Sequence, residues 1–317
     1  MRDLLILGGT GFVGRVLCER LIEHFAGQAR LTVPTRRLQH GKALLTLPTI
    51  RLIEADLHDD AQLASLVAGH DAVINLVAIL HGSASDFERV HVALPRRLAE
   101  ACRAVGVRRL LHVSALGVAA DAPSNYLRSK AAGEAALRGQ GLDVTVLRPS
   151  VIFGAGDRFL NLFAQLQRVF PLMPLAGSGA RFQPVWVGDV AAALVAGLAR
   201  PQSIGQTYEC AGPSTYTLAE IVRLAGRWAG NERPVLPLPD ALGRVQAALM
   251  SLMPGEPLMS GDNLDSMRVP NVATGWLPGL DALGIAPAAL EAVAPAYLGP
   301  QAGPARLGSW RALARRG

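Results

Sequence analysis

Over the first 150 residues, short apolar runs alternate with longer segments in which apolar residues recur every three to four positions. The short runs are typical of buried strands and the longer segments of amphipathic helices. The predicted strands are DLLILG, RLTVP, IRLIEAD, DAVINLV, RRLLHVSAL and DVTVLRP, which begin at Asp3, Arg30, Ile50, Asp71, Arg108 and Asp143. Strands that alternate with helices predict an α/β fold with a doubly wound parallel sheet of the Rossmann type.

One predicted helix carries a proline inside its apolar stripe. Residues at helical spacing form that stripe: Phe87, Val90, Leu94, Leu98, Ala101 and Val105. Proline cannot donate the backbone hydrogen bond of a helix interior, and its ring clashes with the preceding turn. Pro95 therefore predicts a kink or break near residues 91–95.

The regular alternation stops after residue 150, where prolines and glycines become denser. A helix is still predicted after Thr217, because Glu220 three residues on completes a capping box. We expect residues 1–150 to form the nucleotide-binding domain, with 182–212 returning to it. Residues 151–181 and 213–300 form a smaller, irregular domain on the substrate or partner side.

Composition limits the class of protein. The longest apolar run has ten residues, Val190 to Ala199, whereas a membrane-spanning helix needs about 20. The N-terminus lacks the pattern of a secretory signal, so we expect a cytoplasmic protein. The three cysteines have no metal or redox spacing and are interpreted as reduced core thiols. The histidines likewise predict no metal site.

The chain has a net charge of +6. Its positive residues are spread along the chain except in the tail, residues 301–317, which is basic and carries no acid. A solvated tail and a contact with a partner or the inner face of a membrane are both compatible with this pattern. No motif supports binding to nucleic acid.

The stretch GGTGFVG follows the first strand and opens the first helix. Gly8 permits the tight turn, Gly11 lets the backbone approach a pyrophosphate, and Gly14 permits close packing of the helix. This context predicts a dinucleotide-binding loop.

The end of the second strand bears on the choice of cofactor. An NAD site favours an acid about 20 residues past the loop, but residues 28–48 contain no Asp or Glu. Arg36 and Arg37 stand where an arginine can bind a 2′-phosphate, so NADP(H) is favoured over NAD(H). Asp56 and Leu57 follow the third strand and either meet the adenine edge or, for Asp56, cap the next helix.

Tyr126 and Lys130 lie four residues apart in NYLRSK, and the chain has only one other lysine, Lys42. On a helix this spacing places both side chains on one face. A neighbouring ammonium stabilises a phenolate, so Tyr126 is predicted to act as general acid or base and Lys130 to tune it. Ser114, at the end of the fifth strand, either polarises the substrate oxygen or merely ends the strand.

These motifs resemble the short-chain dehydrogenase/reductase superfamily, in its extended and atypical, epimerase-like branch. GGTGFVG, NYLRSK, LRPSVIFG and VWVGDVAAAL occur in the family's order. HVSALG, YLRSKAAGE and LRPSVIFGAGDRFLN are similar to the subgroup that contains the nucleotide-binding accessory subunit of respiratory complex I. PGEPLMSGDNLDSM and LGIAPAALEAVAPAYL continue that resemblance to about residue 299.

The resemblance implies a Rossmann domain that holds NAD(P)(H). The residues it implies in contact with the nucleotide are Gly8, Thr10, Gly11, Phe12, Val13, Gly14, Arg36, Arg37, Asp56, Leu57, Ala78, Lys130 and Pro149. Extended members commonly carry a second Ser or Thr after the fifth strand, whereas here Ala115 follows Ser114. This departure weakens the case for turnover.

Two hypotheses follow. The first is an NADP(H)-dependent oxidoreductase, with Tyr126, Lys130 and Ser114 acting on a small carbonyl or quinone-like compound. The second is a non-catalytic nucleotide-binding protein that supports respiratory complex I or a quinone-synthesis complex.

Overall fold

The computed structural model describes residues 2–251 and 259–299, so the basic tail lies outside the described residues. Seven strands form the central sheet, and every neighbouring pair is parallel. Their order across the sheet is β11 (Thr207–Cys210), β6 (Asp143–Pro149), β5 (Arg109–Val113), β4 (Ala72–Asn75), β1 (Asp3–Leu7), β2 (Arg30–Thr35) and β3 (Ile50–Glu54). The predicted Rossmann sheet is confirmed.

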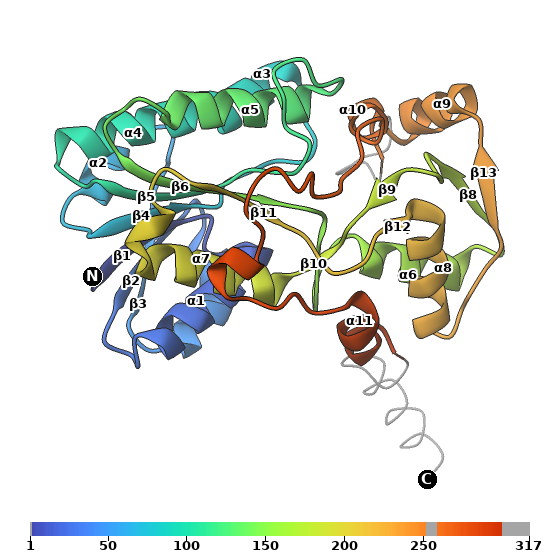
Figure 1. Cartoon of the computed structure of the whole chain (residues 1–317), viewed down its shortest axis with the longest axis horizontal. Helices are drawn as coiled ribbons and strands as arrows, with labels where there is room; N and C mark the ends of the chain where they lie inside the picture. The colour runs from blue at the N-terminus through green and yellow to red at the C-terminus, as the bar shows by residue number, and fades with distance from the viewer. Residues whose placement is uncertain (1, 252–258, 300–317) are drawn as a thin grey trace, which may run out of the picture.

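Helices cover both faces of this sheet (Figure 1). They are α1 (Phe12–His24) and α7 (Val187–Ala199) on one face, and α2 (Asp60–Val67), α4 (Leu94–Ala104) and α5 (Asn125–Leu137) on the other. Strand β1 is apolar on both faces of the sheet. Its successive side chains point to opposite sides. Leu4 and Ile6 pack with α1 and α7, and Leu5 and Leu7 pack with α2 and α4.

The predicted break at Pro95 is observed as a change of helix type. The chain passes from α3 (Ala84–Phe87) through a π-helical turn, η2 (Glu88–Ala93), into α4. Pro95 then occupies the first turn of α4, where a missing N–H costs little. Such π-helical turns often occur at functional sites, and this one carries His91.

Beyond residue 150 the chain builds a smaller lobe beside the carboxyl ends of the strands (Figure 1). Its elements are β7 (Ile152–Phe153), α6 (Leu160–Val169), β8 (Met173–Ala176), β9 (Arg181–Phe182), β10 (Val185–Trp186), β12 (Tyr216–Thr217), α8 (Leu218–Trp228), β13 (Val235–Leu238), α9 (Asp240–Ser251), α10 (Gly261–Ser266) and α11 (Leu290–Leu298). A separate apolar core holds α6, α8 and α11 together. The capping box of Thr217 and Glu220 is confirmed at the start of α8.

Part of this later chain returns to the Rossmann sheet. Helix α7 packs on α1, and β11 adds the last parallel strand beside β6. These contacts support the proposed assignment of residues 182–212 to the nucleotide-binding domain. The remaining short helical turns are η1 (Leu38–Thr46), η3 (Pro201–Ser203) and η4 (Asp281–Leu283).

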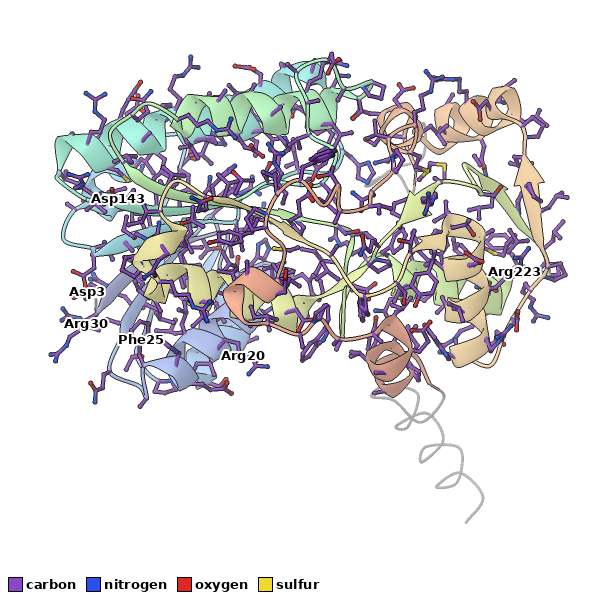
Figure 2. The ribbon with its side chains drawn as sticks, in the orientation of Figure 1. Asp3, Arg20, Phe25, Arg30, Asp143 and Arg223 are labelled. Atoms are coloured by element: carbon purple, nitrogen blue, oxygen red, sulfur yellow. The ribbon has the colours of Figure 1, made fainter. Side chains whose placement is uncertain are left out.

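The two edges of the sheet differ in character. The amino ends of the strands carry surface ion pairs, such as Arg30 with Asp3 (Figure 2). Arg108 pairs with Asp143 at the same edge. The carboxyl ends face the smaller lobe, and ligands bind at this edge in open α/β sheets. Cys18, Cys102 and Cys210 are buried and unbridged, as predicted. Within residues 2–251 and 259–299, no helix has the length and apolarity needed to span a bilayer.

Candidate active site

The loop between β1 and α1 requires glycine at two positions. Gly8 has a φ of 80°, and a Cβ there would lie 3.1 Å from the carbonyl carbon of Leu76. A Cβ on Gly14 would lie 2.5 Å from backbone atoms of Gly8 and Gly9. The loop therefore folds tightly against β4, and α1 packs against the loop without a side chain between them.

The amino end of α1 is left open by its own sequence. Gly11 is the N-cap residue, and it provides no side-chain cap. The first turn contains no acid, and a Cβ on Gly11 would approach only the Gly8 oxygen, at 3.1 Å. Thr10, Phe12 and Val13 flank this opening and are half-buried. Because first-turn N–H groups and the helix dipole favour an anion, this cradle fits a pyrophosphate.

Arg36 and Arg37 are exposed and directly follow β2. Burial lowers the pKa of His58, and the positive charges of Arg89, Arg97 and Arg36 lower it further, whereas Asp56 opposes them. The end of β2 therefore presents two exposed arginines, suited to a phosphate, whereas β3 ends at Glu54 and is followed by Asp56.

Asp56 is exposed, and its Oδ1 accepts a hydrogen bond from the N–H of His58 at 2.9 Å. The alternative role of Asp56 as a helix cap is wrong, because Asp59 is the N-cap of α2 and accepts from the N–H of Gln62 at 3.0 Å. Asp56 lies three residues too early for that contact. Leu57 is half-buried against the core beneath α2.

Ala78 and Pro149 lie at the carboxyl edge, as the sequence placed them. Ala78 is exposed in the loop after β4, and Pro149 is the buried last residue of β6. Asn75, at the end of β4, binds its own loop by accepting from the N–H of Val77 at 3.1 Å. Its amide also lies 3.2 Å from His112 Nδ1 on β5.

Tyr126 is half-buried in the first turn of α5, and its ring packs edge-on against His91 and Phe87 at centroid distances of 5.5 and 6.1 Å. Burial raises the pKa of the Tyr126 phenol to about 12. The hydroxyl therefore carries its proton at neutral pH, as a general acid does. Burial sets this pKa, and the tuning expected from the Lys130 ammonium is not seen in the structure.

Lys130 is only 2% exposed, and its ammonium donates a 2.7 Å hydrogen bond to the Val113 carbonyl at the end of β5. Burial lowers the pKa of Lys130 to about 8, while the charge of Glu134 opposes this effect. Glu134 is itself held by Arg148 at 2.7 Å. The side chain thus reaches the end of β5, the strand that Ser114 follows.

Ser114 follows β5 directly and is 3% exposed. Its hydroxyl finds no hydrogen-bond partner among the described residues, and neither does Nε2 of His112, two residues earlier on the same strand. An unpaired buried polar atom is costly and calls for a missing partner. The orphaned hydroxyl stands at the ligand edge of the sheet, which fits the predicted role of Ser114 toward a substrate oxygen.

His91 links three parts of the site and escaped the sequence analysis. Its Nε2 accepts from the N–H of Ile79 at 3.1 Å, and its Nδ1 lies 2.8 Å from Ser129 Oγ. Ser129 in turn donates to the carbonyl of Tyr126 at 2.8 Å. Burial and the charge of Lys130 lower the pKa of His91 to about 3, so the ring is neutral. It fixes the loop that carries Ala78 against the helix of Tyr126.

Among the described residues, no cluster of three or more His, Cys, Asp or Glu side chains is arranged to hold a metal ion. Asp262 and Asn271, which contact this edge from the smaller lobe, also escaped the sequence analysis.

Comparison with known proteins gives consistent matches. The NAD dependent epimerase/dehydratase family matches residues 4–211. The mouse mitochondrial NADH dehydrogenase (ubiquinone) 1 alpha subcomplex subunit 9 is 33% identical over 294 residues, which cover 90% of this chain and 77% of the mouse protein. The ceramide reductase of Caulobacter vibrioides is 32% identical over 237 residues, covering 74% of this chain and 73% of that protein.

Among solved structures, the UDP-glucose 4-epimerase of Thermus thermophilus in complex with NAD superposes with a TM-score of 0.62. It is 22% identical and covers 84% of this chain and 99% of its own. This likeness shows a shared fold.

Proposed function

The chain belongs to the NAD dependent epimerase/dehydratase family, as its motifs predicted, and on that premise we propose an NADP(H)-dependent oxidoreductase that acts on an apolar carbonyl compound. One observation carries the proposal. The buried hydroxyl of Ser114 has no partner among the described residues, yet it stands at the ligand edge beside the helix of Tyr126 and Lys130. A carbonyl oxygen of a substrate would satisfy it.

The residues divide the chemistry as follows. The nicotinamide nucleotide, when bound, supplies or takes up the hydride at the carbonyl carbon. Ser114 donates a hydrogen bond to the carbonyl oxygen, and Tyr126 transfers its phenolic proton to the same oxygen. The phenolate that remains is stabilised by the ammonium of Lys130. In the reverse direction the Tyr126 phenolate accepts the proton of the alcohol.

NADP(H) is the proposed cofactor. Arg36 and Arg37 are exposed directly after β2, and residues 28–48 contain no acid for a ribose hydroxyl. The amino end of α1 is proposed to hold the pyrophosphate, and Lys130 the nicotinamide ribose.

Calorimetric titration with NADPH and NADH tests this choice. Wild type is expected to bind NADPH more tightly, and Arg36→Asp is expected to weaken NADPH binding by about 10-fold to 100-fold, because a charge-assisted contact is lost. Arg103→Asp, an exposed arginine near the amino ends of the strands, is the control and should change neither affinity. Tighter binding of NADH by wild type would overturn the choice of NADP(H).

The proposed substrate is apolar or quinone-like. Tyr126 packs with an apolar cluster made of Ala115, Val118, Ala122 and Leu127, with Val269 laid against it. A charged substrate would lose hydration there without a partner, whereas an apolar carbonyl compound would not. The Caulobacter relative is a ceramide reductase, which is in keeping with this class.

A non-catalytic role is the second candidate, favoured by the identity with a mouse subunit of NADH dehydrogenase over 90% of this chain. On this hypothesis the bound nucleotide stabilises the fold, and the protein supports a respiratory or quinone-synthesis complex in the cytoplasm, at the inner face of a membrane. Complementation of a deletion strain with Tyr126→Phe separates the two. An unchanged phenotype, with NADPH binding retained, would favour the non-catalytic role.

A further inference from the structure

The first turn of α5, which carries Tyr126, is capped from two sources. Ser124, the local N-cap residue, accepts from the N–H of Leu127 at 3.1 Å. The other two N–H groups of the turn, those of Asn125 and Tyr126, donate to Asp262 at 2.7 and 3.0 Å. One carboxylate from α10 therefore holds the backbone of the proposed catalytic residue.

This contact joins residues that are 136 positions apart in sequence. The first turn of α5 contains no acidic residue of its own. A carboxylate at a helix amino end is stabilised by the dipole and by charge-assisted hydrogen bonds. Asp262 supplies the negative charge that the local sequence of α5 lacks.

The rest of the segment 260–271 follows the same edge. Val269 lies against Gly117, where a Cβ would come within 3.1 Å of its side chain, and it packs in the apolar cluster of Tyr126. The Asn271 side chain accepts from Ser150 Oγ at 2.7 Å and from the N–H of Val151 at 2.8 Å. The segment thus extends from the helix of Tyr126 to the end of β6.

We propose that Asp262 is a positioning residue for Tyr126. It fixes the first turn of α5 and makes the placement of the phenol depend on docking of the segment 260–271. The kinetic part of this inference rests on the proposed oxidoreductase function. The structural part does not, because it concerns two backbone hydrogen bonds. The hydrogen bonds of Asp262 go to Asn125 and Tyr126, which are not among the residues proposed to bind the nucleotide. Loss of Asp262 should therefore leave the affinity for nucleotide unchanged.

Asp265 offers a matched control on the same helix. Its carboxylate pairs with Arg244 at 2.8 Å and lies 3.7 Å from Arg268, so its ionic partners within residues 2–251 and 259–299 are these arginines and not α5. Asp265→Ala therefore removes an acid from α10 without removing the cap of Tyr126. Asp262→Asn keeps one carbonyl oxygen and should retain one of the two bonds.

Hydrogen–deuterium exchange on full-length protein tests the structural part. Asp262→Ala is expected to speed exchange of the Asn125 and Tyr126 amides on the order of tenfold, which corresponds to one lost hydrogen bond. Asp262→Asn should give a smaller increase, and Asp265→Ala none. Peptides from β1 and α1 serve as the internal reference for intact folding. Exchange of the α5 amides that is unchanged in Asp262→Ala would overturn the inference.

Kinetics with NADPH then separate positioning from general destabilisation. Asp262→Ala is expected to lower kcat on the order of tenfold while the Kd for NADPH stays within about twofold. Asp262→Asn should recover part of kcat. An unaltered kcat, or a fall in nucleotide affinity equal to the fall in kcat, would contradict a positioning role. If wild type reduces no carbonyl compound, the proposed function fails, while the exchange result still decides whether Asp262 holds the helix.

Discussion

The glycine loop and the surroundings of Tyr126 are built in opposite ways. The loop packs on itself and on neighbouring strands of the Rossmann sheet. The atoms that exclude a Cβ on Gly14 belong to Gly8 and Gly9, and those nearest a Cβ on Gly8 belong to Leu76 and Val77. The first turn of α5, by contrast, is held by Asp262, and the nearby end of β6 is held by Asn271 across 121 positions. The proposed nucleotide cradle is built from the Rossmann sheet and its first helix, whereas the side proposed for proton transfer is held in part by the smaller lobe.

This difference implies that nucleotide binding and proton transfer by Tyr126 can be lost independently. A change in the smaller lobe should disturb Tyr126 before it disturbs the loop between β1 and α1. A change in the loop should remove nucleotide binding whatever the smaller lobe does.

Gly14→Ala should break the local side. The added Cβ would lie 2.5 Å from three backbone atoms of the loop, which has no flexible side chain to move away. We expect a loss of about 3 kcal/mol in the free energy of unfolding and loss of NADPH binding, measured by chemical denaturation and calorimetry. Gly139→Ala, in an open turn with a φ of 70°, is the control for a generic glycine effect. Normal NADPH affinity in Gly14→Ala would contradict the tight packing of the loop.

Lys130→Met should separate stability from binding. Burial lowers the pKa of Lys130 to about 8, so the folded state binds fewer protons than the unfolded state between about pH 8 and pH 10. The free energy of unfolding of wild type therefore rises with pH across this window, and below it the buried ammonium costs about 3 kcal/mol. Because the lost bond to Val113 offsets part of that cost, Lys130→Met should gain about 2 kcal/mol at pH 7.

The same variant should bind NADPH at least about tenfold more weakly, because its proposed contact with the nicotinamide ribose is gone. Denaturation at pH 7 and pH 10, together with calorimetric titration, provides the measurement. If the variant is less stable at pH 7 and binds NADPH normally, Lys130 does not contact the nucleotide.

His91 should make the stability of the protein depend on pH in the acid range. Its pKa is lowered to about 3, so between pH 6.5 and pH 3 the unfolded state binds the extra proton and stability falls as pH falls. At pH 5 this amounts to about 2 kcal/mol from His91 alone. His91→Gln should lose stability at pH 7 but show a shallower decline toward pH 5 in denaturation curves. A decline toward pH 5 in His91→Gln as steep as that of wild type would contradict this role of His91.

The parallel sheet and the glycine loop could be predicted because they depend on short patterns. Alternating strand and helix periods specified the order of elements, and the residues of GGTGFVG contact each other. Lys130 was recognised by its spacing from Tyr126, and Pro95 by its effect on a helix. These features depend on neighbours within a few turns of the chain.

The remainder of the site lay beyond sequence reasoning for a physical reason. His91 reaches Ile79 and Ser129 from a π-helical turn, and no residue pattern predicts such a turn. Asp262 and Asn271 reach the site only because the smaller lobe docks on the carboxyl edge of the sheet. His112 could have been noticed in the sequence, because it is a polar residue inside an apolar strand, two positions before Ser114. The cap role that was one of two alternatives for Asp56 shows the same limit, since Asp59, three positions later, was an equally suitable residue.

The central claim is that Tyr126 performs chemistry on a substrate beside a bound NADP(H). The most direct measurement compares wild type and Tyr126→Phe for NADPH affinity by calorimetry and for NADPH oxidation with apolar ketones and short-chain quinones. The account predicts that both proteins bind NADPH within about twofold of each other, and that Tyr126→Phe loses at least about 100-fold in kcat. Equal oxidation rates in the two proteins, or no oxidation by wild type with any of these compounds, would contradict it.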